Sequence, residues 1–186
     1  GKVKVFTVSG YKQIKDIKVG DFVLTHKGRF RAVTNTLEHY TKRYKGEVVR
    51  IRYSNKKGKS KTLEVTPDHK FLTQRGWVRA DELTKNDTLK LLVVECENCG
   101  HDISLVSGST LCYRCKANYK FIDHPIEEIT KIQVHSRKLY DITVDEDHSF
   151  VVEGIVSHNC TCPLAVLPDG FGFDKNGELV YIGEGK

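Results

Sequence analysis

The groups with the clearest chemical potential are four consecutive residues, Ser157-His158-Asn159-Cys160. An asparagine side chain can attack its own main-chain carbonyl, which forms a succinimide and breaks the following peptide bond. Unaided, this reaction is slow, because an amide nitrogen is a poor nucleophile and a peptide amine is a poor leaving group. An imidazole that protonates the amine or helps to activate the amide contributes about 10²–10⁴-fold. Since Cys160 follows the bond that would break, its thiol could accept an acyl group as a thioester.

Two other segments supply groups of the same kind. Thr66-Pro-Asp-His69 carries a hydroxyl and an imidazole at the end of a predicted strand, and Tyr140-Asp-Ile-Thr-Val144 leads to His148. Each group alone has an ordinary structural explanation: the threonine as a turn residue, the histidine as a core imidazole, the aspartate as a hydrogen bonder at a strand end. Their order and spacing together favour one shared reaction site.

Short strands are the elements that must position these groups. Residues 2–8 alternate polar and apolar side chains, as a half-buried strand does. Further strands are predicted at 22–25, 30–33, 48–53, 62–66, 88–94, 126–134, 139–144 and 150–152, with Gly154 turning the chain into 155–156. Only residues 80–83 predict a short helix. Many short strands with close turns predict a compact all-β domain.

The composition is that of an ordinary globular protein, with 39% hydrophobic and 29% charged residues among 186. No apolar run approaches the roughly 18 residues that a membrane span requires, and no secretory signal is evident. None of the six cysteines lies in the first half of the chain, and their arrangement is not typical of a secreted disulfide framework. We therefore expect a protein of the reducing cytoplasm that does not contact a membrane.

The net charge of +6 has its densest run at Asn55–Lys61. Such a run could contact phosphates, but it is also typical of a solvated hairpin loop. No aromatic residue is interleaved with these lysines to stack on bases, which weakens the nucleic-acid interpretation.

The remaining chemistry-bearing residues are two Cys-x-x-Cys pairs separated by twelve residues: Cys96 with Cys99, and Cys112 with Cys115. Four thiolates can surround Zn²⁺ tetrahedrally, and the spacing is typical of a zinc ribbon. Because four sulfur ligands leave no open position for water, we expect the zinc to be structural. Two disulfides or free thiols are the alternatives. Zinc ribbons often bind nucleic acid, but a metal staple for a weakly packed insertion is the simpler interpretation.

Taken together, these blocks resemble an intein of the hedgehog/intein (Hint) superfamily, and the resemblance covers nearly everything from Gly1 to Cys160. Four blocks occur in the family's order, which makes the match specific. They are residues 10–23, which resemble the first block after its nucleophile, 66–69 for the Thr-x-x-His block, 140–150 for the penultimate block and 155–160 for the final one.

The resemblance implies a horseshoe-shaped all-β Hint fold that holds both splice junctions side by side, and autocatalytic, single-turnover splicing that needs no cofactor. His69 would polarise and protonate the amide at the N-terminal junction, with Thr66 assisting. Asp141 would organise thiol and proton traffic between the junctions. His148 and His158 would assist cyclisation of Asn159, and Cys160 would be the second nucleophile and first extein residue.

One departure from the family pattern concerns the first nucleophile. Inteins of this kind begin with Cys or Ser, whereas this sequence begins with Gly1. The register of the first block places the nucleophile about three residues upstream. The sequence as printed is therefore expected not to splice fully alone, and a separate N-terminal fragment would be one way to complete it.

The expected organisation is an intein domain in two parts, residues 1–95 and 117–159, around a zinc-ribbon-like insertion at 96–116, followed by a C-terminal extein segment at 160–186. The partners would be the flanking exteins in cis. Two alternatives stay open: a zinc-dependent nucleic-acid-binding module with an incidental His-Asn-Cys, and an intein-like domain that cleaves without ligating.

Overall fold

The computed structural model describes residues 3–38, 44–54, 58–93, 120–159, 171–173 and 179–181. These residues form strands and two short 3-10 turns, Ile14–Asp16 and Ala80–Glu82. The strands are β1 (Lys4–Thr7), β2 (Gly10–Gln13), β3 (Phe22–Leu24), β4 (Phe30–Glu38), β5 (Tyr44–Ser54), β6 (Ser60–Val65), β7 (Lys70–Thr73), β8 (Gly76–Arg79), β9 (Thr88–Val93), β10 (Lys120–Pro125), β11 (Glu128–Arg137), β12 (Tyr140–Val144), β13 (Ser149–Val152), β14 (Ile155–His158), β15 (Phe171–Phe173) and β16 (Leu179–Tyr181). Within the described ranges, no helix is long and apolar enough to cross a membrane.

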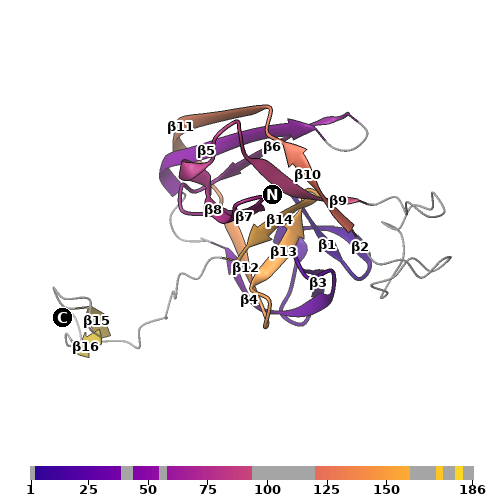
Figure 1. Ribbon diagram of the computed structural model, residues 1–186. Helices are drawn as coiled ribbons and strands as arrows, with labels where there is room; N and C mark the ends of the chain where they lie inside the picture. Colours follow the sequence, from indigo (N-terminus) through magenta and orange to yellow (C-terminus); the bar gives the residue numbers. More distant parts are fainter. Residues whose placement is uncertain are drawn as a thin grey trace.

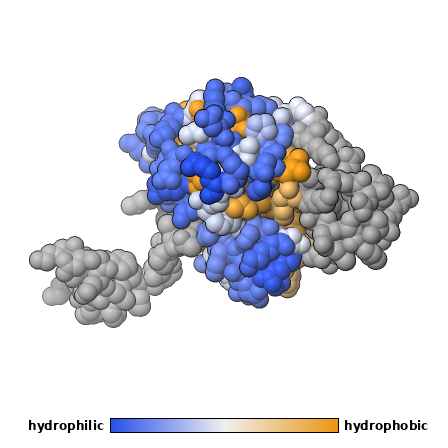
Figure 2. All heavy atoms as spheres, in the orientation of Figure 1, coloured by the Kyte–Doolittle hydropathy of each residue, from blue (hydrophilic) through white to orange (hydrophobic). Residues whose placement is uncertain are grey.

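The largest sheet runs in the order β10-β9-β7-β14-β13-β1-β3-β4-β12, with β2 beside β1 and β8 beside β7. Figure 1 shows β13 and β14 at the centre of this arrangement. All four residues of β13 are buried, as are Ile155, Val156 and Ser157 of β14. Because side chains on both faces of these strands are covered, their sequences do not alternate between polar and apolar. The described surface in Figure 2 is mostly hydrophilic, as burial of the apolar side chains requires.

A second sheet, in the order β11-β5-β6, lies across the top of the view in Figure 1. In β5 the side chains of Val49, Ile51 and Tyr53 are buried, whereas Arg50 and Arg52 between them are exposed. This alternation follows from the two-residue repeat of a strand with one face on the core. The second sheet therefore closes one side of the main apolar cluster.

The β13–β14 hairpin ties the two sheets together at its turn. Glu153 and Gly154 both have positive φ, of 49° and 93°, as a tight two-residue hairpin turn requires. The hydroxyl of Tyr53 in β5 donates to the Glu153 carbonyl at 3.0 Å, and Lys61 in β6 pairs with the Glu153 carboxylate at 2.8 Å. Strand β14, which Asn159 follows directly, is thus anchored at its beginning.

Strands β9 and β10 are adjacent and antiparallel, with Val93 opposite Lys120 and Thr88 opposite Pro125. Strand β9 also contacts β14, because Leu91 pairs with Ile155 and the Leu92 N–H donates to the Gly154 carbonyl at 2.7 Å. The chain that leaves β9 and the chain that enters β10 are therefore side by side.

The all-β prediction is confirmed, and each strand expected from the sequence overlaps a strand of the structure. The predicted helix at 80–83 is a 3-10 turn, Ala80–Glu82. Within the main sheet, strands β2, β7, β8 and β10 were not predicted. Each is four to six residues long, and none of their sequences alternates clearly between polar and apolar side chains.

Candidate active site

Asn159 follows directly after β14, the strand between β13 and β7 in the main sheet. Its relative exposure is 2%. Its backbone N–H donates to the His148 carbonyl at 3.0 Å, which continues the β13–β14 pairing in which Ser149 faces His158. The backbone of Asn159 is therefore held at the edge of a rigid hairpin.

His158 contacts the peptide bond that the sequence predicts to break. Its Nδ1 lies 2.6 Å from the carbonyl oxygen of Asn159. Because a carbonyl oxygen can only accept, Nδ1 carries the proton and donates it to this hydrogen bond. The donated hydrogen bond polarises the Asn159 carbonyl and would stabilise negative charge developing on its oxygen.

The ring of His158 packs against Trp77 from β8, with 4.8 Å between centroids and 90° between planes. Trp77 also contacts His26, at 5.5 Å between centroids and 80° between planes. His26 Nδ1 lies 2.7 Å from Ser149 Oγ. Burial lowers the pKa of His26. Trp77 therefore contacts both imidazoles, and its packing against His158 restricts the orientation of that ring.

The Asn159 side chain is also buried, and no described residue donates a hydrogen bond to its Oδ1. Leaving a buried acceptor unpaired costs about 1–3 kcal/mol.

His148 lies in the turn between β12 and β13, with an exposed side chain and a φ of 48°. Positive φ is uncommon for residues other than glycine. The conformation directs the His148 carbonyl to the Asn159 N–H, while the imidazole faces solvent.

His69 is joined to β14 through Ser157, the residue before His158. The His69 N–H donates to the Thr66 carbonyl at 3.1 Å, so the Thr66–His69 segment forms a tight turn between β6 and β7. The His69 Nε2 is hydrogen-bonded to Ser157 Oγ, and its ring lies 5.2 Å from that of Phe71. Burial lowers the pKa of His69 from 6.5 to about 4, with a smaller lowering from His158. The imidazole is therefore neutral at pH 7.

This burial predicts a pH-dependent stability. Between pH 6.5 and about 4 the unfolded chain binds a proton at His69 and the folded chain does not, so the free energy of unfolding falls as the pH falls. The gap between the two pKa values corresponds to about 3 kcal/mol, fully retained above pH 6.5 and lost toward pH 4. In an uncleavable background, His69→Gln should flatten this part of the curve of unfolding free energy against pH, measured by urea titration.

Burial of His26 also makes the free energy of unfolding fall as the pH falls through this window. Only the difference between the parent chain and His69→Gln therefore reports on His69. Equal slopes in the two chains between pH 4 and 6.5 would contradict burial of a neutral His69.

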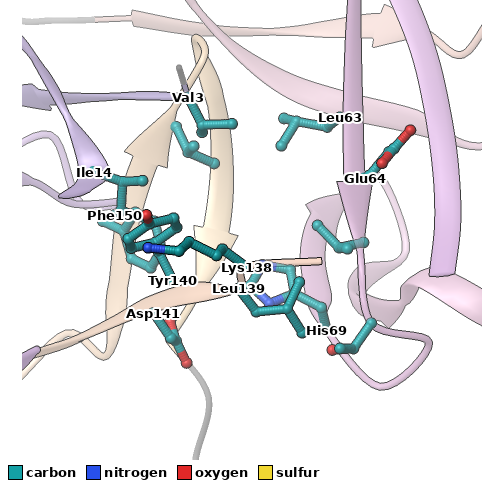
Figure 3. Close-up of a pocket in the computed structure, with 13 residues that line it drawn as sticks. Val3, Ile14, Leu63, Glu64, His69, Lys138, Leu139, Tyr140, Asp141 and Phe150 are labelled. Carbon is teal, nitrogen blue, oxygen red and sulfur yellow. The ribbon is translucent and has the colours of Figure 1, made fainter. Parts of the chain in front are cut away.

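A pocket of about 160 Å³ brings together Thr66, His69 and Asp141. Figure 3 shows Val3 and Phe150 on its upper left, with Asp141 and His69 toward the bottom of the view. Further apolar lining comes from Ile14, Leu63, Val65, Leu139, Tyr140 and Val152. Glu64 and Lys138 add two charged side chains to the lining, and Val3, the first described residue, lines the same pocket as Thr66, His69 and Asp141.

The structure places the predicted residues in two connected groups: Thr66, His69 and Asp141 at the pocket, and His148, His158 and Asn159 at the end of β14. The hydrogen bond between His69 and Ser157 joins the groups. Cys160 and the predicted zinc ligands Cys96, Cys99, Cys112 and Cys115 lie outside the described residues. Within those residues no cluster of three or more His, Cys, Asp or Glu could hold a metal.

Sequence reasoning missed His26, Trp77, Asp147 and Ser149. Asp147 and Ser149 flank His148, which was a signal for testing them as supporting residues. His26 and Trp77 gave no such signal, because no motif connects residues that lie 51 positions apart.

The comparisons with known proteins agree with this geometry. A family model described as the intein splicing domain matches residues 23–159. The DnaB intein from Synechocystis sp. PCC 6803 superposes with a TM-score of 0.57 and 19% identity, over 86% of this chain and 96% of that one. The DnaX mini intein from Spirulina platensis gives 0.57 and 19%, over 86% and 97%. At these identities the likeness shows the fold.

Curated relatives match over shorter stretches. A probable translation initiation factor IF-2 of Thermococcus kodakarensis is 34% identical over 76 residues, which are 41% of this chain and 6% of that protein. An uncharacterized protein of Methanocaldococcus jannaschii is 48% identical over 44 residues, 24% of this chain and 5% of that protein. The chain spans about a twentieth of the length of these relatives.

The fold and the Asn159 site define a self-processing domain of the kind that performs protein splicing. The chain belongs to the intein splicing domain family, which matches it over most of its length. The function that this family supports is autocatalytic protein splicing and cleavage, and the expectation of an intein is confirmed.

Proposed function

We propose that this chain cleaves its own Asn159–Cys160 bond by asparagine cyclisation, with His158 and His148 assisting. The observation that carries the proposal is the 2.6 Å hydrogen bond from His158 Nδ1 to the Asn159 carbonyl oxygen. The Asn159 N–H held by the His148 carbonyl at 3.0 Å supports it. Together they fix the carbonyl that would be attacked.

In the proposed step, the Asn159 side-chain nitrogen bonds to its own carbonyl carbon, and the bond from that carbon to the nitrogen of Cys160 breaks. The side-chain amide loses one proton and the departing amine gains one, so no water is consumed. His158 stabilises the charge on the carbonyl oxygen. The imidazole of His148 assists the proton transfer.

The pocket is where we place chemistry at the upstream junction. His69 polarises and protonates the amide there, Thr66 assists, and Asp141 organises proton and thiol traffic toward Cys160, the second nucleophile. The shared lining of the pocket by these three polar residues and Val3 supports this assignment. Because His69 is neutral at pH 7, it polarises this amide by donating a hydrogen bond, and it must take up a proton before it can protonate the amide.

Zinc, in this proposal, has no part in cleavage. Cys96, Cys99, Cys112 and Cys115 would hold one structural Zn²⁺ in an insertion at 96–116. The adjacent ends of β9 and β10 support an insertion here, because they allow a small unit to leave and rejoin the sheet at one point. Four thiolates suit Zn²⁺ and leave no coordination site for substrate.

The partners of the reaction are the exteins in cis: the segment from Cys160 onward and the segment upstream of residue 1, or a separate N-terminal fragment. We assign the chain to the reducing cytoplasm, where the cysteine thiols stay available. The structure does not favour the nucleic-acid alternative, because described cations near the lysine run are engaged: Arg50 with Glu64, Arg52 with Glu128, and Lys61 with Glu153.

The test is the intact mass of the purified chain over a day, with and without a thiol. The expected result is a fragment that begins at Cys160 and a remainder that ends in a succinimide. Their masses should sum to that of the starting chain, whereas hydrolysis would add the mass of one water.

A second chain, extended upstream so that Cys stands at the expected nucleophile position, tests the coupling of the two junctions. If neither chain releases the Cys160 fragment, the assignment of Asn159 as a cleavage residue is wrong. The reaction class would then have to be sought elsewhere in the chain.

A further inference from the structure

The turn that carries His148 has a strained backbone. Glu146 and His148 both adopt positive φ, of 52° and 48°, on either side of Asp147. Two such residues in one turn persist only where the surrounding structure holds them. The carbonyl of the second one is the acceptor for the Asn159 N–H, so whatever holds this turn also sets the position of Asn159.

The Asp147 side chain fixes this turn by binding residues at the tip of the β3–β4 hairpin. Its side chain is fully buried. Arg29 donates to it from Nε at 2.8 Å and from Nη2 at 2.6 Å. The Thr25 hydroxyl donates at 2.7 Å, and Lys27 Nζ lies at 2.9 Å. These hydrogen bonds, that from Arg29 first, lower the pKa of Asp147 far below its usual range, so the carboxylate is charged whenever the protein is folded.

The same hairpin tip also contacts the residue on the other side of His148. Ser149 Oγ accepts a hydrogen bond from the backbone N–H of His26 at 3.2 Å and lies 2.7 Å from its Nδ1. Residues 25–29 therefore contact both neighbours of His148. A displacement of the tip would move the His148 carbonyl from two directions.

We propose that the β3–β4 hairpin tip, residues 25–29, is a positioning element for the cleavage step, with Arg29–Asp147 as its central ion pair. Neither residue touches the bond that breaks. They act by fixing the His148 carbonyl, which in turn orients Asn159 toward His158. The expected effect of the hairpin tip on the cleavage rate rests on the proposed function. Its expected effect on the hydrogen bond of the Asn159 N–H does not.

The fold contains a second ion pair of nearly identical construction that lacks this connection. Arg75 donates to the buried carboxylate of Asp87 at 2.6 and 2.8 Å, and the Thr84 hydroxyl donates to it at 3.1 Å. These hydrogen bonds lower the pKa of Asp87 to about 2. Asp87 directly precedes β9, and among the described residues neither its carboxylate nor Arg75 is hydrogen-bonded to Asn159, His148 or either neighbour of His148. It is a matched control for Asp147.

The experiment compares Arg29→Gln with Arg75→Gln in the full chain. Lys27 and Thr25 remain to compensate Asp147 in the first variant, so both should fold. The rate of Asn159–Cys160 cleavage is measured under conditions where urea titration shows both variants fully folded. Small misplacements of reacting groups cost up to about 10²-fold, so Arg29→Gln should slow cleavage by about 10- to 100-fold, Arg29→Lys should restore part of the rate, and Arg75→Gln should leave it within about two-fold.

A second readout does not depend on cleavage. In an Asn159→Ala background, the backbone N–H at position 159 should lose hydrogen-exchange protection in Arg29→Gln and keep it in Arg75→Gln. Equal protection in both variants would overturn the positioning role. If the parent chain fails to cleave while protection is lost only in Arg29→Gln, the proposed function fails and the positioning role stands.

Discussion

Replacing Asn159 with alanine should abolish cleavage at the 159–160 bond without lowering the stability of the fold. The substitution removes the nitrogen that attacks the carbonyl, and no other side chain can form the same ring at that position. It also removes Oδ1, which is buried without a donor among the described residues. Because an unpaired buried acceptor is costly, its removal should offset the loss of packing.

Intact mass over a day measures the first effect, and the urea midpoint of unfolding measures the second. Asn35→Ala, at an exposed position in β4, is the matched control and should cleave at the parent rate. A Cys160 fragment released from Asn159→Ala at that rate would show that cleavage does not proceed by cyclisation. Such a result would leave hydrolysis at this bond as the explanation.

Replacing His158 with alanine should slow the same cleavage by about 10²–10³-fold, the usual cost of removing one hydrogen-bond donor that stabilises charge on a reacting oxygen. The variant loses the 2.6 Å hydrogen bond to the Asn159 carbonyl, so charge on that oxygen is no longer stabilised. Trp77 would face the vacated space, but β14 keeps its backbone pairing with β13 and β7. The effect should therefore fall on rate more than on folding.

The measurement is the first-order rate constant for release of the Cys160 fragment, with the unfolding midpoint measured in parallel. His135→Ala, on an exposed position of β11, controls for loss of an imidazole as such. His158→Gln keeps a side-chain N–H donor and should recover part of the rate. A parent-like rate in His158→Ala would show that the hydrogen bond to the carbonyl contributes nothing to the reaction.

Much of the fold could be predicted from local pattern. Strand β5 shows why: its buried and exposed residues alternate, so one face must meet a core. Strand β14 was expected only as Ile155-Val156, because burial on both faces removes the alternation. Its central place depends on pairing with β7 and β9, about 65 to 85 residues earlier in the sequence. Such pairing leaves no periodic signal within the strand itself.

The site residues also fall into a part that local sequence predicts and a part that it does not. The groups that touch the scissile bond lie within a few residues of it, so Ser157-His158-Asn159 could be recognised as a unit. The groups that hold them in place do not: Arg29 lies 118 positions from Asp147, and His26 lies 123 from Ser149. Residue types alone cannot reveal such pairs, because an arginine and an aspartate that far apart in the sequence have many other partners available.

The pairing of β9 with β10 also defines an insertion point in the sheet. A chain that leaves at Val93 returns at Lys120, about 5 Å away in an antiparallel ladder. A two-residue turn could connect the two strands directly. An inserted segment whose own ends lie that close could also connect them without strain. An inserted segment with ends farther apart would distort β9. Strand β9 pairs with Ile155 and is hydrogen-bonded to the Gly154 carbonyl, at the start of β14. The distortion would then reach β14, which Asn159 follows directly. The distance between the ends of an inserted segment therefore determines whether the insertion leaves cleavage unchanged or slows it.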